Sequence, residues 1–186
     1  QDNEKFKGVS RKRCLELLLE MGGLQVSQDQ FESWLEEKNA DYLKYIGTMD
    51  ASEILPDVSR VLDFLKGRKI PMALGSASKN AVPILEKVGL TDYFSTVVDG
   101  TQVVKAKPDP EVFLIAASRL DLPPGACVVI EDAQAGIAAA NTAGMYSIGI
   151  GEAEVLPEAD TVFRDFTEMQ TSYLEEILRL EKKPHK

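Results

Sequence analysis

The feature that most restricts the fold of this chain is the change in residue pattern at Pro56. From residue 57 onward, segments with apolar residues at helical spacing alternate with short runs of apolar and β-branched residues. This alternation is typical of a parallel sheet with helices on both faces, because each parallel strand needs a crossover connection to reach the next one. The pattern predicts an α/β fold in which residues 51–186 form a doubly wound parallel sheet.

The periodicity of the apolar residues places the individual elements. We expect helices at residues 57–67, 80–88, 110–120, 134–143 and 168–181. We expect strands at residues 70–75, 95–98, 127–131, 145–149 and 160–163. The run from Cys127 to Ile130 is apolar throughout, which favours a strand that is covered on both faces. Cys127 is then a buried, inert thiol.

Residues 1–50 carry only helical patterns. Apolar side chains form a broad stripe over residues 11–21, and Gly22 and Gly23 end that helix. Ser27, followed three residues later by Gln30, indicates the start of a second helix. We therefore expect a small α-helical cap over residues 1–50, truncated at its N-terminal side.

Charge and cysteine content exclude several classes of protein. The 186 residues hold 21 Lys and Arg against 30 Asp and Glu, a net charge of −9, which argues against nucleic-acid binding. The apolar runs are far shorter than the roughly 18 residues of a membrane span. Cys14 and Cys127 lie far apart, so neither a disulfide framework nor a zinc site is indicated. We expect a cytoplasmic monomer with no nucleic-acid or membrane partner.

Ligands in open α/β sheets bind at the carboxyl ends of the strands, and three segments at such ends carry unusual residues. The first is Gly75-Ser76-Ala77-Ser78-Lys79-Asn80. Its small residues, free amide groups, hydroxyls and lysine suit an anion. An equally good interpretation is that Ser76 or Ser78 simply caps the following helix.

The second segment is Lys107-Pro108-Asp109-Pro110. Pro108 favours an extended Lys107, Asp109 can cap the next helix, and Pro110 suits its first turn. A lysine fixed in this way can hold a phosphoryl oxygen and neutralise nearby carboxylates. The alternative is a solvated loop lysine.

The third segment is Glu131-Asp132, after Val128-Val129-Ile130. Two adjacent acids at the end of a buried strand need a compensating cation. Oxygen ligands that leave room for water and a substrate phosphate suit Mg²⁺. Alternatively, Asp132 caps a helix and Glu131 is exposed.

In order and spacing, several stretches resemble the haloacid dehalogenase (HAD) superfamily, and within it most closely the beta-phosphoglucomutase subgroup. The matching stretches are residues 8–11, 38–39, 74–80, 105–113 and 130–137. The resemblance implies a HAD-like Rossmannoid core and an enzyme that transfers a phosphoryl group on a sugar phosphate through an aspartyl-phosphate. The reaction it implies is the interconversion of beta-glucose 1-phosphate and glucose 6-phosphate.

The resemblance also implies roles for individual residues. Ser76 and the Ala77 amide bind the transferring phosphoryl group, and Lys107 bridges that group and the nucleophile. Glu131 and Asp132 belong to the Mg²⁺ site. The other phosphate and the sugar are contacted by Arg11, Lys38, Ser78, Lys79 and Asn80.

The sequence departs from the family pattern in three places. Cys14 and Ala133 stand where Ser is expected, and the family's Asp-x-Asp nucleophile motif is absent. The segment Val97-Val98-Asp99-Gly100-Thr101 lacks an acid at the nucleophile position and is read as a turn. We therefore expect the motif and the first core strand to lie upstream of Gln1, with strands 70–75 and 127–131 flanking an empty slot. On this view the chain is a fragment that is inactive as written.

Two alternative functions remain. A sugar-phosphate or phosphoglycolate phosphatase has the same core chemistry, with water attacking the phospho-enzyme in place of a sugar hydroxyl. The second alternative is that the chain is a non-catalytic module without a nucleophile.

Overall fold

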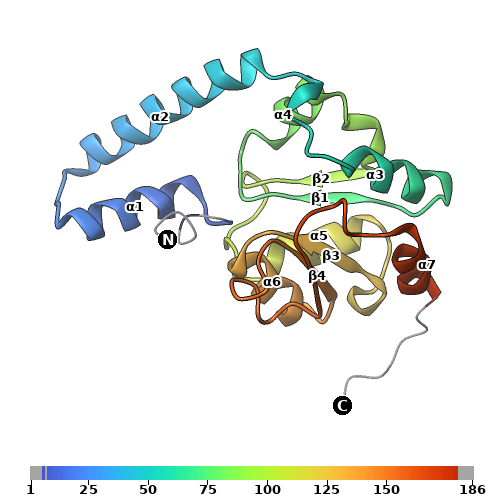
Figure 1. Ribbon diagram of the computed structural model, residues 1–186. Coiled ribbons are helices and arrows are strands. Elements are labelled where there is room, and N and C mark those ends of the chain that lie inside the picture. Colours follow the sequence, from blue (N-terminus) through green and yellow to red (C-terminus); the bar gives the residue numbers. More distant parts are fainter. Residues whose placement is uncertain (1–5, 7, 180–186) are drawn as a thin grey trace.

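The computed structural model describes residues 6 and 8–179 of the chain. Helices α1 (Arg11–Gly22) and α2 (Gln28–Thr48) form a hairpin that extends to one side of an α/β core (Figure 1). The predicted boundaries of the hairpin are confirmed. Gly23 adopts a left-handed conformation after α1, and Ser27 Oγ accepts a hydrogen bond from the Gln30 amide at the start of α2.

Among the described residues, the core contains five parallel strands in two sheets. Strand β1 (Ala73–Gly75) pairs with β2 (Thr96–Val98), and the register places Gly75 opposite Val98. The second sheet has the order β3-β4-β5, formed by Val128–Glu131, Tyr146–Ile150 and Thr161–Phe163. Within the part of the chain that the structure describes, no strand pairing joins β1 to β3.

Helices cover both faces of the core, as the doubly wound prediction requires. Helices α5 (Glu111–Arg119) and α6 (Gln134–Thr142) pack on the face to which Val98 and Val129 belong. On the opposite face, Ile148 packs with residues of α3 (Val58–Gly67) and α7 (Thr171–Arg179). The chain also contains α4 (Ala81–Val88) and short 3₁₀ helices at Ala51–Glu53, Thr91–Tyr93 and Pro124–Ala126.

Most predicted boundaries agree with the structure within one or two residues, and the two exceptions are the starts of β1 and α7. Strand β1 begins at Ala73, three residues later than predicted. Pro71 has no amide hydrogen for a ladder, and the Ile70 amide donates to Leu65 O at the end of α3. Helix α7 begins at Thr171, three residues later than predicted. Its predicted end at 181, like residues 1–5 and 7 of the predicted cap, lies outside the described residues.

The prediction that strand 127–131 is covered on both faces is wrong. Val129 is buried, whereas Val128 and Ile130, which point to the other face, are 42% and 37% exposed. Cys127 is only half-buried, although burial still raises the pKa of its thiol. Among the residues described, no helix combines the length and the apolar character that a membrane crossing requires.

Candidate active site

Lys107 brings the three predicted segments together at the carboxyl ends of β1 and β3. Its ammonium group donates to Gly75 O at 3.3 Å, at the end of β1, and to Glu131 Oε1 at 2.6 Å, at the end of β3. The Lys107 and Glu131 side chains are only 6% and 11% exposed. The attraction in a charge pair so deeply buried offsets its desolvation cost only with good geometry and further hydrogen bonds. This pair therefore defines a fixed electrostatic centre.

Three neighbouring groups fix the Lys107–Glu131 pair. The Lys107 ammonium lies 4.7 Å from the centre of the Phe113 ring, and Glu131 Oε2 accepts a hydrogen bond from the Asp132 amide at 2.9 Å. A Cβ atom at Gly136 would lie 1.8 Å from Glu131 Oε1, so only glycine leaves room for the carboxylate beside α6. The alternatives of a solvated Lys107 and an exposed Glu131 are therefore wrong.

Asp132 stands beside this pair with a different environment. It is exposed, and it does not cap α6, because the residue at the cap position is Ala133 and no side chain caps the helix. Asp109 precedes the cap position of α5, which Pro110 occupies, and its Oδ1 accepts the Glu111 amide in the first turn of that helix. The two adjacent acids therefore have different environments: Glu131 is bound to Lys107, and Asp132 faces solvent.

The loop after β1 holds its two serine hydroxyls by internal hydrogen bonds. Ser76 Oγ accepts the Ser78 amide, and Ser78 Oγ accepts the Asn80 amide, each at 3.1 Å. Ser78 therefore supports the start of α4, whereas Ser76 makes no contact of this kind with the helix. Each hydroxyl keeps its own hydrogen for donation. In the described part of the chain, the amides of Ala77 and Lys79 donate to no protein group.

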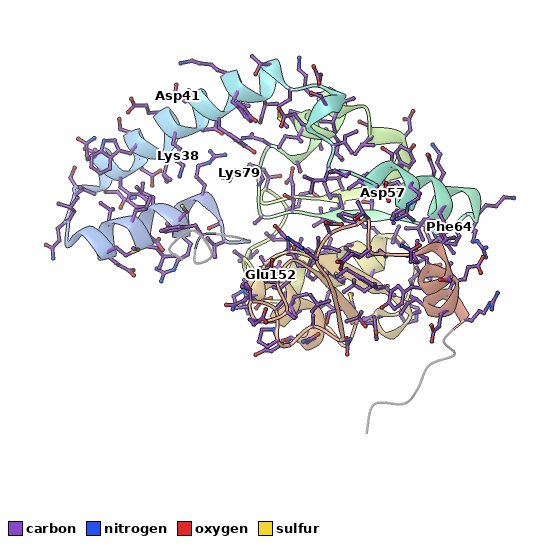
Figure 2. All side chains as sticks on the ribbon, in the orientation of Figure 1. Lys38, Asp41, Asp57, Phe64, Lys79 and Glu152 are labelled. Carbon is purple, nitrogen blue, oxygen red and sulfur yellow. The ribbon has the colours of Figure 1, made fainter. Side chains whose placement is uncertain are left out.

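The helical hairpin reaches this loop through α2. Asn80, which is buried, donates from Nδ2 to Asn39 Oδ1 at 3.1 Å. Lys38 lies next to Asn39, and its ammonium is 3.7 Å from Cys14 Sγ. Figure 2 shows Lys38 on the side of α2 that faces Lys79. Arg11 begins α1 and is half-buried.

Several residues that shape the site carried no clear signal in the sequence. The sequence gave no signal that Asn39 contacts Asn80, because Asn39 lies 41 positions away on a helix. Phe113 fitted the apolar pattern of α5 equally well as a core residue. Gly136 and Gly100 matter through close approach of other atoms, which requires the fold to be known.

Comparisons with known proteins decide the family. The sequence profile described as haloacid dehalogenase-like hydrolase matches residues 3–144. The chain belongs to this family. It is 39% identical over 176 residues to beta-phosphoglucomutase from Bacillus subtilis, covering 94% of this chain and 78% of that protein. It is 30% identical to the phosphorylated carbohydrates phosphatase of Thermotoga maritima, covering 95% of this chain and 82% of that protein.

The same relationship holds in three dimensions. The crystal structure of beta-phosphoglucomutase from Clostridium difficile has a TM-score of 0.89 to this HAD-family chain at 36% identity. The match covers 95% of this chain and 80% of that one. The predicted superfamily and its fold are therefore confirmed, and the relatives are phosphomutases and phosphatases.

Proposed function

We propose that this HAD-family chain binds a sugar phosphate and positions its phosphoryl group for transfer, in the interconversion of beta-glucose 1-phosphate and glucose 6-phosphate by the intact parent protein. The observation that carries the proposal is the buried Lys107 ammonium, which touches both the end of β1 and Glu131. A fixed cation there neutralises charge on a phosphoryl group held by the loop after β1. The identity to beta-phosphoglucomutase supports this choice of reaction.

The loop after β1 supplies the donors for the phosphoryl oxygens. Ser76 is fixed by the bond from the Ser78 amide, so its hydroxyl hydrogen is free to donate to an oxygen. The Ala77 amide adds a second donor. In this proposal Ser76 and Ala77 position the transferring group, and Lys107 stabilises its charge.

The residues of the hairpin and the start of α4 suit the rest of the substrate. A sugar bisphosphate carries roughly −4 charges near neutral pH. Lys79 and Asn80 follow Ser78, and the Asn39–Asn80 hydrogen bond brings Lys38 toward them. We assign Ser78, Lys79, Asn80 and Arg11 to the second phosphate and Lys38 to the sugar. Residues 1–50 then act as a cap over the core of residues 51–186.

The acids at the end of β3 fit a divalent cation in part. Among the described residues, no group of three or more His, Cys, Asp or Glu side chains is placed to hold a metal ion. Glu131 and Asp132 offer two carboxylates, which leaves ligand positions open for other oxygen atoms. That suits Mg²⁺, which keeps waters and substrate oxygens as ligands. Asp132 would hold the ion with Glu131, whose Lys107 contact ties the ion to the phosphoryl site. When bound, Mg²⁺ supplies charge stabilisation for the phosphoryl oxygens.

The nucleophile is assigned to no residue of this chain. The 186 residues contain no Asp-x-Asp sequence. Val97 and Val98 end strand β2, and the predicted turn follows them, with Asp99 Oδ1 accepting the Thr101 amide. In this proposal the chain binds, orients and neutralises the phosphoryl group, and the phosphorylated aspartate belongs to the complete native protein.

A primed turnover assay tests the proposal. The native full-length protein is incubated with Mg²⁺, beta-glucose 1-phosphate and a trace of glucose 1,6-bisphosphate. We expect glucose 6-phosphate without release of inorganic phosphate. Net phosphate release without glucose 6-phosphate would instead establish the phosphatase reading, which the similarity to the carbohydrate phosphatase favours. If neither product forms, the protein is a non-catalytic binding module.

A further inference from the structure

The loop after β1 is pinned from behind by the loop after β2. The Ser76 amide donates to Val98 O at 2.8 Å, and the Gly100 amide donates to Ser78 O at 3.2 Å. These bonds lie on either side of Ala77, whose amide donates to no group in the described part of the chain. The backbone of the proposed phosphoryl-binding loop therefore has a fixed support on its β2 side.

Gly100 allows an approach that no other residue permits. A Cβ atom at position 100 would lie 2.6 Å from Ala77 O and 3.3 Å from Ala77 C. Both are backbone atoms, which cannot swing aside as the end of a side chain can. Gly100 is not among the glycines with a positive φ angle, so the contact, and not the local conformation, requires glycine.

The turn that carries Gly100 is itself held firmly. Asp99 is buried at 6% exposure, and its Oδ1 accepts both the Thr101 amide at 2.9 Å and the Thr101 hydroxyl at 2.6 Å. The Gln102 amide closes the turn on Asp99 O at 3.0 Å. Any added bulk at position 100 must therefore displace Ala77, since its own turn resists movement.

We propose that Gly100 is a positioning residue that sets the donor geometry of the phosphoryl-binding loop by packing directly on the Ala77 carbonyl. The inference rests on the proposed function of that loop. Displacing the Ala77 carbonyl rotates the peptide group between Ala77 and Ser78. The Ser78 amide then leaves Ser76 Oγ, and the Ser76 hydroxyl loses its orientation together with the Ala77 amide.

The test measures the dissociation constant of inorganic phosphate for the 186-residue chain, by amide chemical shifts. In the parent chain we expect saturable shifts at Ala77 and Lys79. Gly100→Ala is expected to weaken phosphate binding at least tenfold, while the melting temperature stays within a few degrees of the parent value. Gly47→Ala is the matched control, because a Cβ there meets no atom within 4 Å, and its affinity is expected to stay within twofold of the parent.

A cycle with Ser76→Ala separates positioning from general damage. If Gly100 acts through the loop donors, Gly100→Ala lowers phosphate affinity less than threefold in the Ser76→Ala background, where the Ser76 hydroxyl is already absent. Should Gly100→Ala fail to fold, Thr101→Val replaces it, with an expected loss of threefold or more. Unchanged affinity in the folded variant, or an undiminished tenfold loss in the Ser76→Ala background, overturns the positioning role alone. A parent chain that shows no saturable phosphate binding overturns the proposed function as well.

Discussion

The helical hairpin and the α/β core differ sharply in how much apolar surface they bury. Helix α1 has no buried residue, and α2 buries only Phe31 and Ile46. In the core, α5 and α6 each bury four residues over nine positions. The hairpin instead leaves large apolar side chains exposed, among them Leu18, Met21, Trp34 and Tyr45. Most of the folding free energy must therefore come from the core.

The hairpin is joined to the core by a small number of polar contacts. Asn39 accepts from Asn80, and Lys87 Nζ donates to Gly47 O at 3.2 Å near the end of α2. A unit with few buried contacts opens at a lower free-energy cost than the core. The difference suits a cap that closes over a ligand on a rigid base.

Core and hairpin substitutions of similar size should differ most in stability. Ile148, in β4, is 1% exposed, and Leu18, in α1, is 44% exposed. We expect Ile148→Ala to lower the free energy of unfolding by about 4 kcal/mol, through lost transfer energy and a cavity. Leu18→Ala should cost below about 1 kcal/mol. Urea unfolding measures both, and equal losses would remove the contrast between the two regions.

The buried charge of the core gives the next largest effect. Lys107→Met leaves Glu131 buried without its partner, and we expect a loss of about 3 kcal/mol. Lys105→Met is the control, because its side chain is 71% exposed and its pair with Asp109 should contribute below about 0.5 kcal/mol. Adding Glu131→Gln to Lys107→Met should recover part of the loss. A Lys107→Met variant as stable as the Lys105→Met control would mean that the pair is not buried in solution.

Removing one of the contacts between the two regions, the Asn39–Asn80 hydrogen bond, should destabilise the hairpin selectively. Asn39→Ala leaves the buried Asn80 amide without its acceptor, at a cost of about 1 kcal/mol. Hydrogen exchange should then become faster in α2 and remain unchanged in β4. Uniformly faster exchange would show that the hairpin and the core unfold as one unit. Asp41→Ala, on the same helix and in an exposed ion pair with Lys44, should leave α2 exchange unchanged.

The smallest expected effect concerns Tyr173, in α7. Burial raises the pKa of Tyr173 to about 12. Its hydroxyl is buried, and no group in the described part of the chain meets it with hydrogen-bond geometry. Because the folded pKa lies above the unfolded value of about 10, this group stabilises the fold below pH 10 and loses that contribution as pH rises toward 12. Tyr173→Phe should change stability little at pH 7 and reduce the alkaline loss. The exposed Tyr42→Phe is the control, and an equal change in both variants would contradict the prediction.

Local pattern predicted most of the fold but only part of the site. The helix limits at Gly23 and Ser27 follow from local capping, so they could be predicted. The exposure of Val128 and Ile130 could not, because it depends on what lies beside β3. The positions of Ser76 and Glu131 at the ends of β1 and β3, and of Lys107 in the loop before α5, indicated a shared edge. The Asn39–Asn80 contact and the packing of Gly100 on Ala77 depend on tertiary approach, which spacing along the chain does not encode.

Crystals of the 186-residue chain can be soaked with tungstate, an electron-dense phosphate analogue, to locate the phosphoryl site. We expect one strong anomalous peak contacted by Ser76 Oγ, the Ala77 amide and Lys107 Nζ, and loss of that peak in Lys107→Met crystals. A peak bound elsewhere, with that loop empty, would contradict the assignment of these residues to one phosphoryl site.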